Sequence, residues 1–133
     1  MSESAVRCTA VWLLDSRYPD ELIYAELRYD TSRPYSVCLA VGTCDPEVCW
    51  YFGRDLLADG RNEPSGEGDV RVAPGPPGEV LVRLGAGTGT VVVSIPLESV
   101  NVFLTECRLL VPPGSEGEHL DIDAALERLL GRE

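Results

Sequence analysis

Four stretches in the first half of the chain alternate apolar and polar residues and are joined by short turns. A period of two is typical of β-strands, because successive side chains point to opposite faces of a sheet. The three connections, at 15–20, 30–34 and 42–46, are too short for the crossover that parallel neighbours need. The pattern therefore predicts an antiparallel meander of four strands. Each strand groups apolar side chains on one face, as follows: Val6, Cys8, Ala10, Trp12 and Leu14; Ile23, Ala25, Leu27 and Tyr29; Tyr35, Val37, Leu39 and Val41; Val48, Trp50 and Phe52.

The second half of the chain predicts a short helix, three more strands and two further helices. Residues 54–59 fit one or two helical turns, with Gly60 as the C-cap. Valine-rich strands follow near 70–72, 80–84 and 91–95. Apolar residues then recur at three- and four-residue steps: Val100, Phe103, Leu104, Cys107 and Val111 after Pro96, and Ile122, Leu126, Leu129 and Leu130 after an N-cap near Asp121.

This order of elements indicates the α+β class. We expect an antiparallel sheet or a partly closed seven-strand β-barrel, with a short mid-chain helix and two C-terminal helices. No linker is long enough to divide the chain, so we expect a single domain over residues 1–133.

The charge of the chain limits its partners and its location. Acids outnumber bases by 22 to 11, and every base is an arginine. A formal charge of −11 repels a phosphate backbone unless the cations cluster, so nucleic acid is not the expected partner. The N-terminal residues lack the cationic start of a signal peptide, and no apolar run reaches the roughly 18 residues of a membrane span. We therefore expect a cytoplasmic protein without membrane insertion.

Cysteine and histidine patterns do not predict a reactive site. The five cysteines form no Cys-x-x-Cys pair, and an odd number in a cytoplasmic chain argues against a disulfide framework. We expect most of them to be small apolar residues of the core. His119, beside Glu118 and Asp121, could serve as a base or metal ligand, but neither a nucleophile nor a second ligand adjoins it. A surface position near a helix start is the favoured interpretation, and we expect no metal, no cofactor and no enzymatic activity.

Two glycine-rich loops look superficially like phosphate-binding loops. The loop at 85–90 joins two predicted strands, whereas a dinucleotide loop leads into a helix whose amides receive the phosphate. The loop at 60–69 leads from a helix to a strand, contains no lysine and carries acids that repel an anion. We expect both to be structural turns. In a more specific hypothesis, arginines pin the second loop through ion pairs that join Arg54, Arg61 and Arg71 to Glu63, Glu67 and Asp69.

Motifs in separate parts of the chain resemble those of a known family. Arg-Asp-Leu-Leu begins at Arg54, Gly-Glu-Gly-Asp-Val follows at 66–70, and Val-Pro-Pro-Gly-Ser-Glu-Gly occupies 111–117. The segments 16–22, 33–41 and 48–57 fit the same pattern. In this combination the motifs are specific. Over nearly its whole length the chain resembles the SsgA-like proteins, regulators of sporulation and cell division in actinobacteria.

The resemblance implies a non-enzymatic adaptor whose fold is similar to that of the Whirly and mitochondrial guide-RNA-binding proteins. It implies a homo-oligomer, with a trimer favoured, and recruitment to division septa. The partners that it implies are other cell-division proteins, either the tubulin-like ring protein FtsZ or a sister SsgA-like protein. Because loops on a rigid scaffold usually carry recognition, the candidate partner-binding residues are Arg54, Asp55, Gly66, Gly68, Asp69, Pro113, Gly114 and His119.

An alternative function is single-stranded nucleic-acid binding, which the Whirly-like fold would suggest. Exposed aromatic rings would then serve as stacking platforms for bases, with Trp12, Tyr24, Trp50 and Tyr51 as candidates. Fold alone does not carry function, and the formal charge of −11 counts against this alternative.

Overall fold

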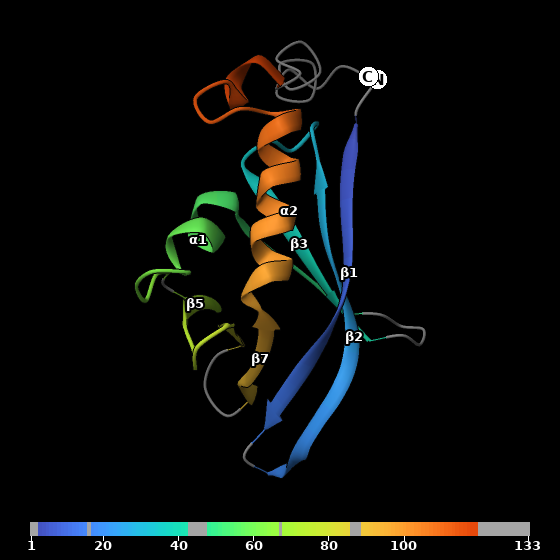
Figure 1. Ribbon diagram of the computed structural model, residues 1–133, viewed down its shortest axis with the longest axis vertical. Coiled ribbons are helices and arrows are strands. Elements are labelled where there is room, and N and C mark those ends of the chain that lie inside the picture. The colour runs from blue at the N-terminus through green and yellow to red at the C-terminus, as the bar shows by residue number, and fades with distance from the viewer. Residues whose placement is uncertain (1–2, 16, 43–47, 67, 86–88, 120–133) are drawn as a thin grey trace, which may run out of the picture.

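Figure 1 shows a computed structural model of the protein, which describes residues 3–15, 17–42, 48–66, 68–85 and 89–119. Seven strands form one sheet in the order β4-β3-β2-β1-β7-β6-β5, and all neighbouring strands are antiparallel. The predicted α+β class, with its seven strands and short mid-chain helix, is confirmed. The elements are β1 (Ser4–Asp15), β2 (Tyr18–Asp30), β3 (Ser36–Val41), β4 (Val48–Gly53), α1 (Arg54–Asp59), β5 (Val70–Pro74), β6 (Glu79–Leu84), β7 (Val91–Pro96), α2 (Leu97–Leu110) and the 3₁₀ helix η2 (Glu116–His119).

The sheet consists of two halves that are joined by the long β1–β2 hairpin. β1 and β2 pair from Ser4 opposite Asp30 to Asp15 opposite Tyr18. β1 reaches the second half through 12–14, which pair with residues of β7. Figure 1 shows the β1–β2 hairpin extending past the lower end of α2, while the sheet curls around the helix as an open half-barrel. The predicted final helix, from Asp121, lies outside the described residues.

Helix α2 fills the inside of this curl. It packs mainly against β1 and also contacts β6 and β7. The predicted apolar stripe of α2 is buried in full, namely Val100, Phe103, Leu104, Cys107 and Val111. Facing side chains such as Leu27, Val80 and Val82 are also fully buried. Each apolar side chain of this size stabilises the fold by about 1.5–3 kcal/mol when it leaves water. The 3.6-residue period therefore located the helical half of the core.

The alternation predicted for β1 is present, but it did not say which face meets α2. Its grouped apolar face exists, but it points away from α2, so that Val6 and Trp12 are 54% and 44% exposed. The buried residues of β1 are instead Ala5, Thr9 and Val11. Because α2 lies directly on this strand, small side chains fit between them. The Thr9 hydroxyl also shares a 2.8 Å hydrogen bond with a serine hydroxyl of α2, which offsets the cost of burying both groups.

Gly60 ends α1 as predicted, but for a different reason. A C-cap glycine usually adopts positive φ, whereas Gly60 has φ of −63°. A Cβ at this position would overlap the side chain of Val72 in β5. Glycine is therefore required here because β5 passes very close to the end of α1.

The described cysteines divide between the core and the surface. Cys38 and Cys107 are buried, whereas Cys8 and Cys49 are exposed. Burial raises the pKa of the Cys107 thiol to about 12, and burial together with the neighbouring Cys49 raises the pKa of Cys38 to about 11. The expected structural role thus fits the two buried thiols. Cys44 lies outside the described residues.

Candidate partner-binding site

The first residue of α1 is a buried arginine. Arg54 is 3% exposed, and its Nη1 donates a 2.7 Å hydrogen bond to the buried carbonyl oxygen of Val111 at the end of α2. Its Nη2 lies 3.1 Å from Oε2 of Glu116 and forms an ion pair with it. The guanidinium also lies over the ring of Tyr29, 5.5 Å from the centroid, and Nη1 is 3.3 Å from the phenolic oxygen. Arg54 therefore joins β2, α1 and the segment after α2.

Glu116 organises the turn that follows α2. Its Oε1 accepts a 2.6 Å hydrogen bond from the amide of Gly114, and the amide of Ser115 donates to the Pro112 carbonyl at 3.0 Å. Its own backbone amide holds the pKa of Glu116 below the ordinary value, and the Gly114 amide and Arg54 act in the same direction against desolvation. Gly114 adopts a φ of 92°, which glycine accommodates without strain. The carboxylate is thus held ionised between the turn and Arg54.

The turn between β2 and β3 joins the same network. The Tyr29 hydroxyl donates a 2.9 Å hydrogen bond to the Pro34 carbonyl, and the Arg54 amide donates to the Tyr35 carbonyl at 2.8 Å. Burial raises the pKa of Tyr29, while the Arg54 charge opposes that shift. Three segments that are far apart in the sequence, 29–36, 53–57 and 111–117, therefore meet around one guanidinium. They coincide with parts of the predicted motifs.

Several side chains around this network face solvent. Tyr35 is 53% exposed, and Asp55, Pro113 and Gly114 are also exposed. We call these four residues the turn surface. Each lies within one residue of a member of the Arg54 network, so the buried ion pair holds the backbone beneath it. Such an arrangement can present a surface of defined shape to a partner.

The other candidate residues are not among the contacts of Arg54 in the described part of the chain. Gly66, Gly68 and Asp69 belong to the connection between α1 and β5, where Gly66 and Gly68 adopt φ values of 103° and 83°. The Asp69 carbonyl accepts a hydrogen bond from the amide that follows β6, so this loop caps the β5–β6 hairpin. His119 is the last residue of η2.

The proposed ion pairs of that loop are not found among the described residues, and Glu67 lies outside them. Arg54 pairs with Glu116 instead. Arg61 donates to the Ala58 carbonyl at 2.9 Å and to the side chain of Asn101 at 2.9 Å. In the described part of the chain, Arg71 has no ion pair. The hypothesis favoured partners close in sequence, whereas Arg54 finds its carboxylate 62 residues away.

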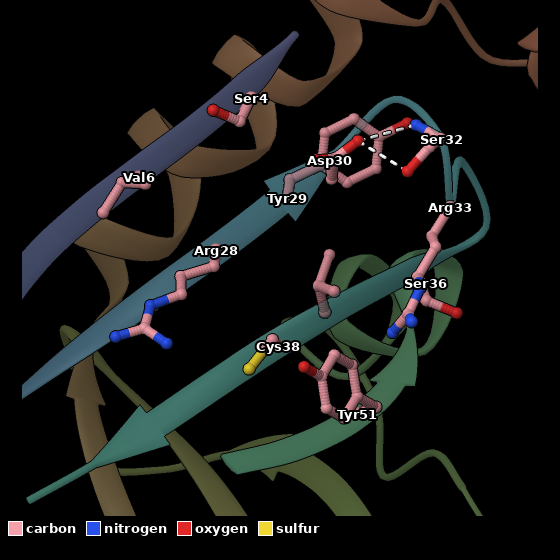
Figure 2. Close-up of a pocket in the computed structure, with 11 residues that line it drawn as sticks. Ser4, Val6, Arg28, Tyr29, Asp30, Ser32, Arg33, Ser36, Cys38 and Tyr51 are labelled. Atoms are coloured by element: carbon pink, nitrogen blue, oxygen red, sulfur yellow. Dashed lines mark hydrogen bonds between the residues drawn. The ribbon is translucent and has the colours of Figure 1, made fainter. Parts of the chain in front are cut away.

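A hollow of about 470 Å³ lies on the outer face of the sheet, the face opposite α2, beside the β2–β3 turn (Figure 2). Its wall includes Arg33, whose guanidinium lies 5.4 Å from the ring centroid of Tyr51. Asp30 accepts hydrogen bonds from the Ser32 amide and hydroxyl and so closes the turn. Sequence reasoning did not identify this hollow, because its residues come from four different elements.

Neither a metal-binding cluster nor a membrane-spanning helix is found among the described residues. There, no group of three or more His, Cys, Asp or Glu side chains could hold a metal ion. No helix in the same part of the chain is long and apolar enough to cross a membrane.

Comparison with known proteins identifies the family. The model of the Streptomyces sporulation and cell division protein SsgA matches residues 23–116. This protein belongs to the SsgA family. The matched region begins in β2 and ends at Glu116, so it contains all members of the Arg54 network. The predicted family resemblance is confirmed.

Individual relatives support the same assignment. The chain is 40% identical to the sporulation-specific cell division protein SsgB of Streptomyces coelicolor over 110 residues, which cover 80% of each chain. It is 39% identical to SsgB of Saccharopolyspora erythraea over 129 residues, or 94% of this chain and 92% of the relative.

Solved structures show the same fold. An SsgA-like sporulation-specific cell division protein from Thermobifida fusca superposes with a TM-score of 0.85 and 29% identity, covering 96% of both chains. A structure from work on SsgB mutations and longitudinal cell division in Streptomyces coelicolor gives a TM-score of 0.82 and 33% identity, covering 90% of this chain and 98% of the other.

Proposed function

We propose that this protein is a non-enzymatic adaptor in sporulation-specific cell division, which presents a rigid surface to other division proteins. Membership of the SsgA family supports the process, since the relatives above are named sporulation-specific cell division proteins. The observation that carries the adaptor mechanism is the buried Arg54–Glu116 pair. A guanidinium that joins three chain segments stabilises shape, and the exposed turn surface above it is available for contact.

The proposed partners are FtsZ or a sister SsgA-like protein. The protein would act in the cytoplasm and would be recruited to division septa through that contact. Tyr35 is exposed, and its carbonyl is bonded to the Arg54 amide. It is the aromatic anchor that we expect a partner to cover, because interface hot spots are enriched in tyrosine. Pro113 and Gly114 would shape the rim of the contact.

We also propose a homo-oligomer, with a trimer favoured. Large apolar side chains are exposed on the outer face of β1, β2 and β4, and such patches are typical of protein interfaces. These side chains are Val6, Trp12, Leu22, Tyr24 and Tyr51. Trp12 and Leu22 lie directly opposite each other in the β1–β2 hairpin and would form the centre of the subunit contact.

The test uses purified full-length protein with FtsZ and with a sister SsgA-like protein. Binding is measured by biolayer interferometry, and the oligomeric state by light scattering after size-exclusion chromatography. We expect Tyr35→Ser to weaken partner binding by roughly tenfold, with an unchanged melting temperature. Leu109→Ser, at a position of α2 that is 79% exposed, is the matched surface control and should bind as the wild type does.

Two results would contradict the adaptor model. The first is partner binding that Tyr35→Ser and Pro113→Ser leave unchanged. The second is tight binding of single-stranded DNA that weakens steeply with salt, because this behaviour is typical of a nucleic-acid protein. Tyr24 and Tyr51 are 62% and 58% exposed, so the stacking rings of the alternative function are accessible for this test.

A further inference from the structure

Two arginines lie side by side on the outer face of β5 and β6. Arg71 and Arg83 are direct partners in the antiparallel register, and both side chains are exposed. In such a pair the Cβ atoms are about 4.5–5.5 Å apart, and like charges directly opposite each other destabilise a sheet. The pair therefore has an unfavourable effect on folding that a purely structural account does not explain.

Three other arginines of this acidic chain have carboxylate partners. Arg17 pairs with Asp15, Arg28 with Glu26 and Arg54 with Glu116. Among the described residues, neither Arg71 nor Arg83 has a hydrogen bond or an ion pair through its side chain. In a chain with 22 acids and 11 arginines, two adjacent arginines that both lack a carboxylate form a local excess of positive charge.

A hollow adjoins this pair. It has a volume of about 400 Å³, and its wall is mostly apolar, with Leu81 and Val92 beside the two arginines. Ser65 and Gly66 form its rim beyond the edge of β5. The Ser65 amide and carbonyl both bond to the backbone of Val72, at 2.8 and 2.9 Å, so the rim is held in place. Charge and apolar surface are thus combined in one rigid depression.

We propose that the Arg71–Arg83 pair and the adjoining hollow bind an acidic segment of a partner protein. Two carboxylates of the segment would each accept hydrogen bonds from one guanidinium, a geometry that arginine favours. An apolar side chain of the same segment would enter the hollow over Leu81 and Val92. This inference rests on the proposed adaptor function and adds the chemistry of one partner contact.

Local features favour a carboxylate-bearing peptide over a nucleic acid. A phosphate backbone needs several cations along its path, while the described surface here offers two beside an apolar wall. Repulsion from acids farther away than a Debye length of about 8 Å is screened at physiological salt. The adjoining 60–69 loop contributes its own acids to the local field, so the two guanidiniums attract a short segment through direct contact rather than at a distance. The apolar wall would lie unused beneath a sugar-phosphate chain.

The experiment measures fluorescence anisotropy of a labelled synthetic peptide in which pairs of glutamates alternate with leucine or valine. A second peptide carries glutamines in place of the glutamates. We expect the acidic peptide to bind and the glutamine peptide not to bind. Arg71→Gln and Arg83→Gln should each weaken binding roughly tenfold, as the loss of a charge-assisted contact does. Arg108→Gln removes an exposed arginine of α2 and should bind within about twofold of the wild type.

The same variants provide a stability readout that separates binding from structure. Because the pair is repulsive, we expect the melting temperature of Arg71→Gln and Arg83→Gln to stay unchanged or to rise. A fall of several degrees in both variants would show that the pair stabilises the sheet and would overturn the proposal. A short oligodeoxythymidylate that binds as tightly as the acidic peptide, and that no longer binds the same variants, would assign the site to nucleic acid. That result would also overturn the proposal.

A parallel capture assay with FtsZ and a sister SsgA-like protein separates the two proposals. Absence of peptide binding alongside normal capture would refute the acidic-segment site alone. Peptide binding by the wild type, with loss in the arginine variants and no capture of either protein, would support the site and refute the proposed partners.

Discussion

Replacing Arg54 with methionine removes the guanidinium and keeps an unbranched apolar stem in its buried position. The largest loss is the 2.7 Å hydrogen bond to the carbonyl of Val111, a residue that is fully buried. An unsatisfied buried acceptor costs about 1–3 kcal/mol. Tyr29 keeps its bond to the Pro34 carbonyl, and Glu116 keeps its bond from the Gly114 amide. The loss of the guanidinium at these two residues therefore adds little to the loss of unfolding free energy. Because Val111 is fully buried, we take the upper part of the range for a buried acceptor, so the expected loss in unfolding free energy is about 2–3 kcal/mol.

A loss of this size is readily measured. For a chain of this length, 1 kcal/mol corresponds to roughly 4 °C in melting temperature, so we expect a fall of about 8–12 °C. Urea unfolding followed by circular dichroism gives the free energy independently. Arg71→Met is the matched control, since Arg71 is exposed and its loss should leave the melting temperature unchanged or higher.

Partner binding by the same variant tests the assigned role of Arg54. Partner binding by Arg54→Met is measured at a temperature where the variant is fully folded. Binding should then weaken only to the extent that the turn surface has become less ordered. An unchanged melting temperature together with complete loss of FtsZ or sister-protein binding would refute the reasoning. That outcome would mean that the guanidinium turns outward and contacts the partner itself.

Three further predictions concern packing, pH and thiol reactivity. Gly60→Ala should destabilise the protein by about 1–3 kcal/mol because its Cβ overlaps β5, while Gly53→Ala, whose Cβ has ordinary contacts, should be nearly neutral in thermal melting. The pKa of Glu116 is lowered on folding, so its stabilising effect is present above its ordinary value of 4.5 and is lost as pH falls through the folded value. Urea unfolding should accordingly show Glu116→Gln less stable than the wild type at pH 7, with a difference that shrinks at pH 3.5. Iodoacetamide at pH 8, followed by peptide mass mapping, should label Cys8 rapidly and Cys107 only after unfolding, because Cys107 is fully buried and its pKa is about 12.

Local patterns predicted the elements well where one face of an element is apolar. The stripe from Val100 to Val111 identified both α2 and its buried side, since proline residues bound the segment and the period is clear. In β1 both faces carry small or apolar residues, so alternation alone could not say which face meets the helix. The deciding factor was the space between β1 and α2, which admits Ala5 and Val11 but leaves Trp12 outside.

The Arg54 network shows a second limit of sequence reasoning. Arg54 was selected because of its motif, but its partner Glu116 lies in an acid-rich turn where it is indistinguishable by composition from surface acids. The pairing depends on the sheet curl that brings the end of α2 to the start of α1. Contacts of this kind follow from topology, and the sequence separation of 62 residues hides them from any local pattern.

Arginine has two different roles in this chain, one in stability and one in the proposed binding. Arg54 is buried, paired and bonded to a main-chain carbonyl, so its removal should cost stability. Arg71 and Arg83 are exposed, adjacent and repulsive, so their removal should cost binding and leave stability intact. Since all three are arginines in the same family-matched region, residues 23–116, residue type and motif membership cannot separate them. Their surroundings separate them. The expected changes in melting temperature, a fall for Arg54 and no change or a rise for Arg71 and Arg83, make that distinction measurable in one series of variants.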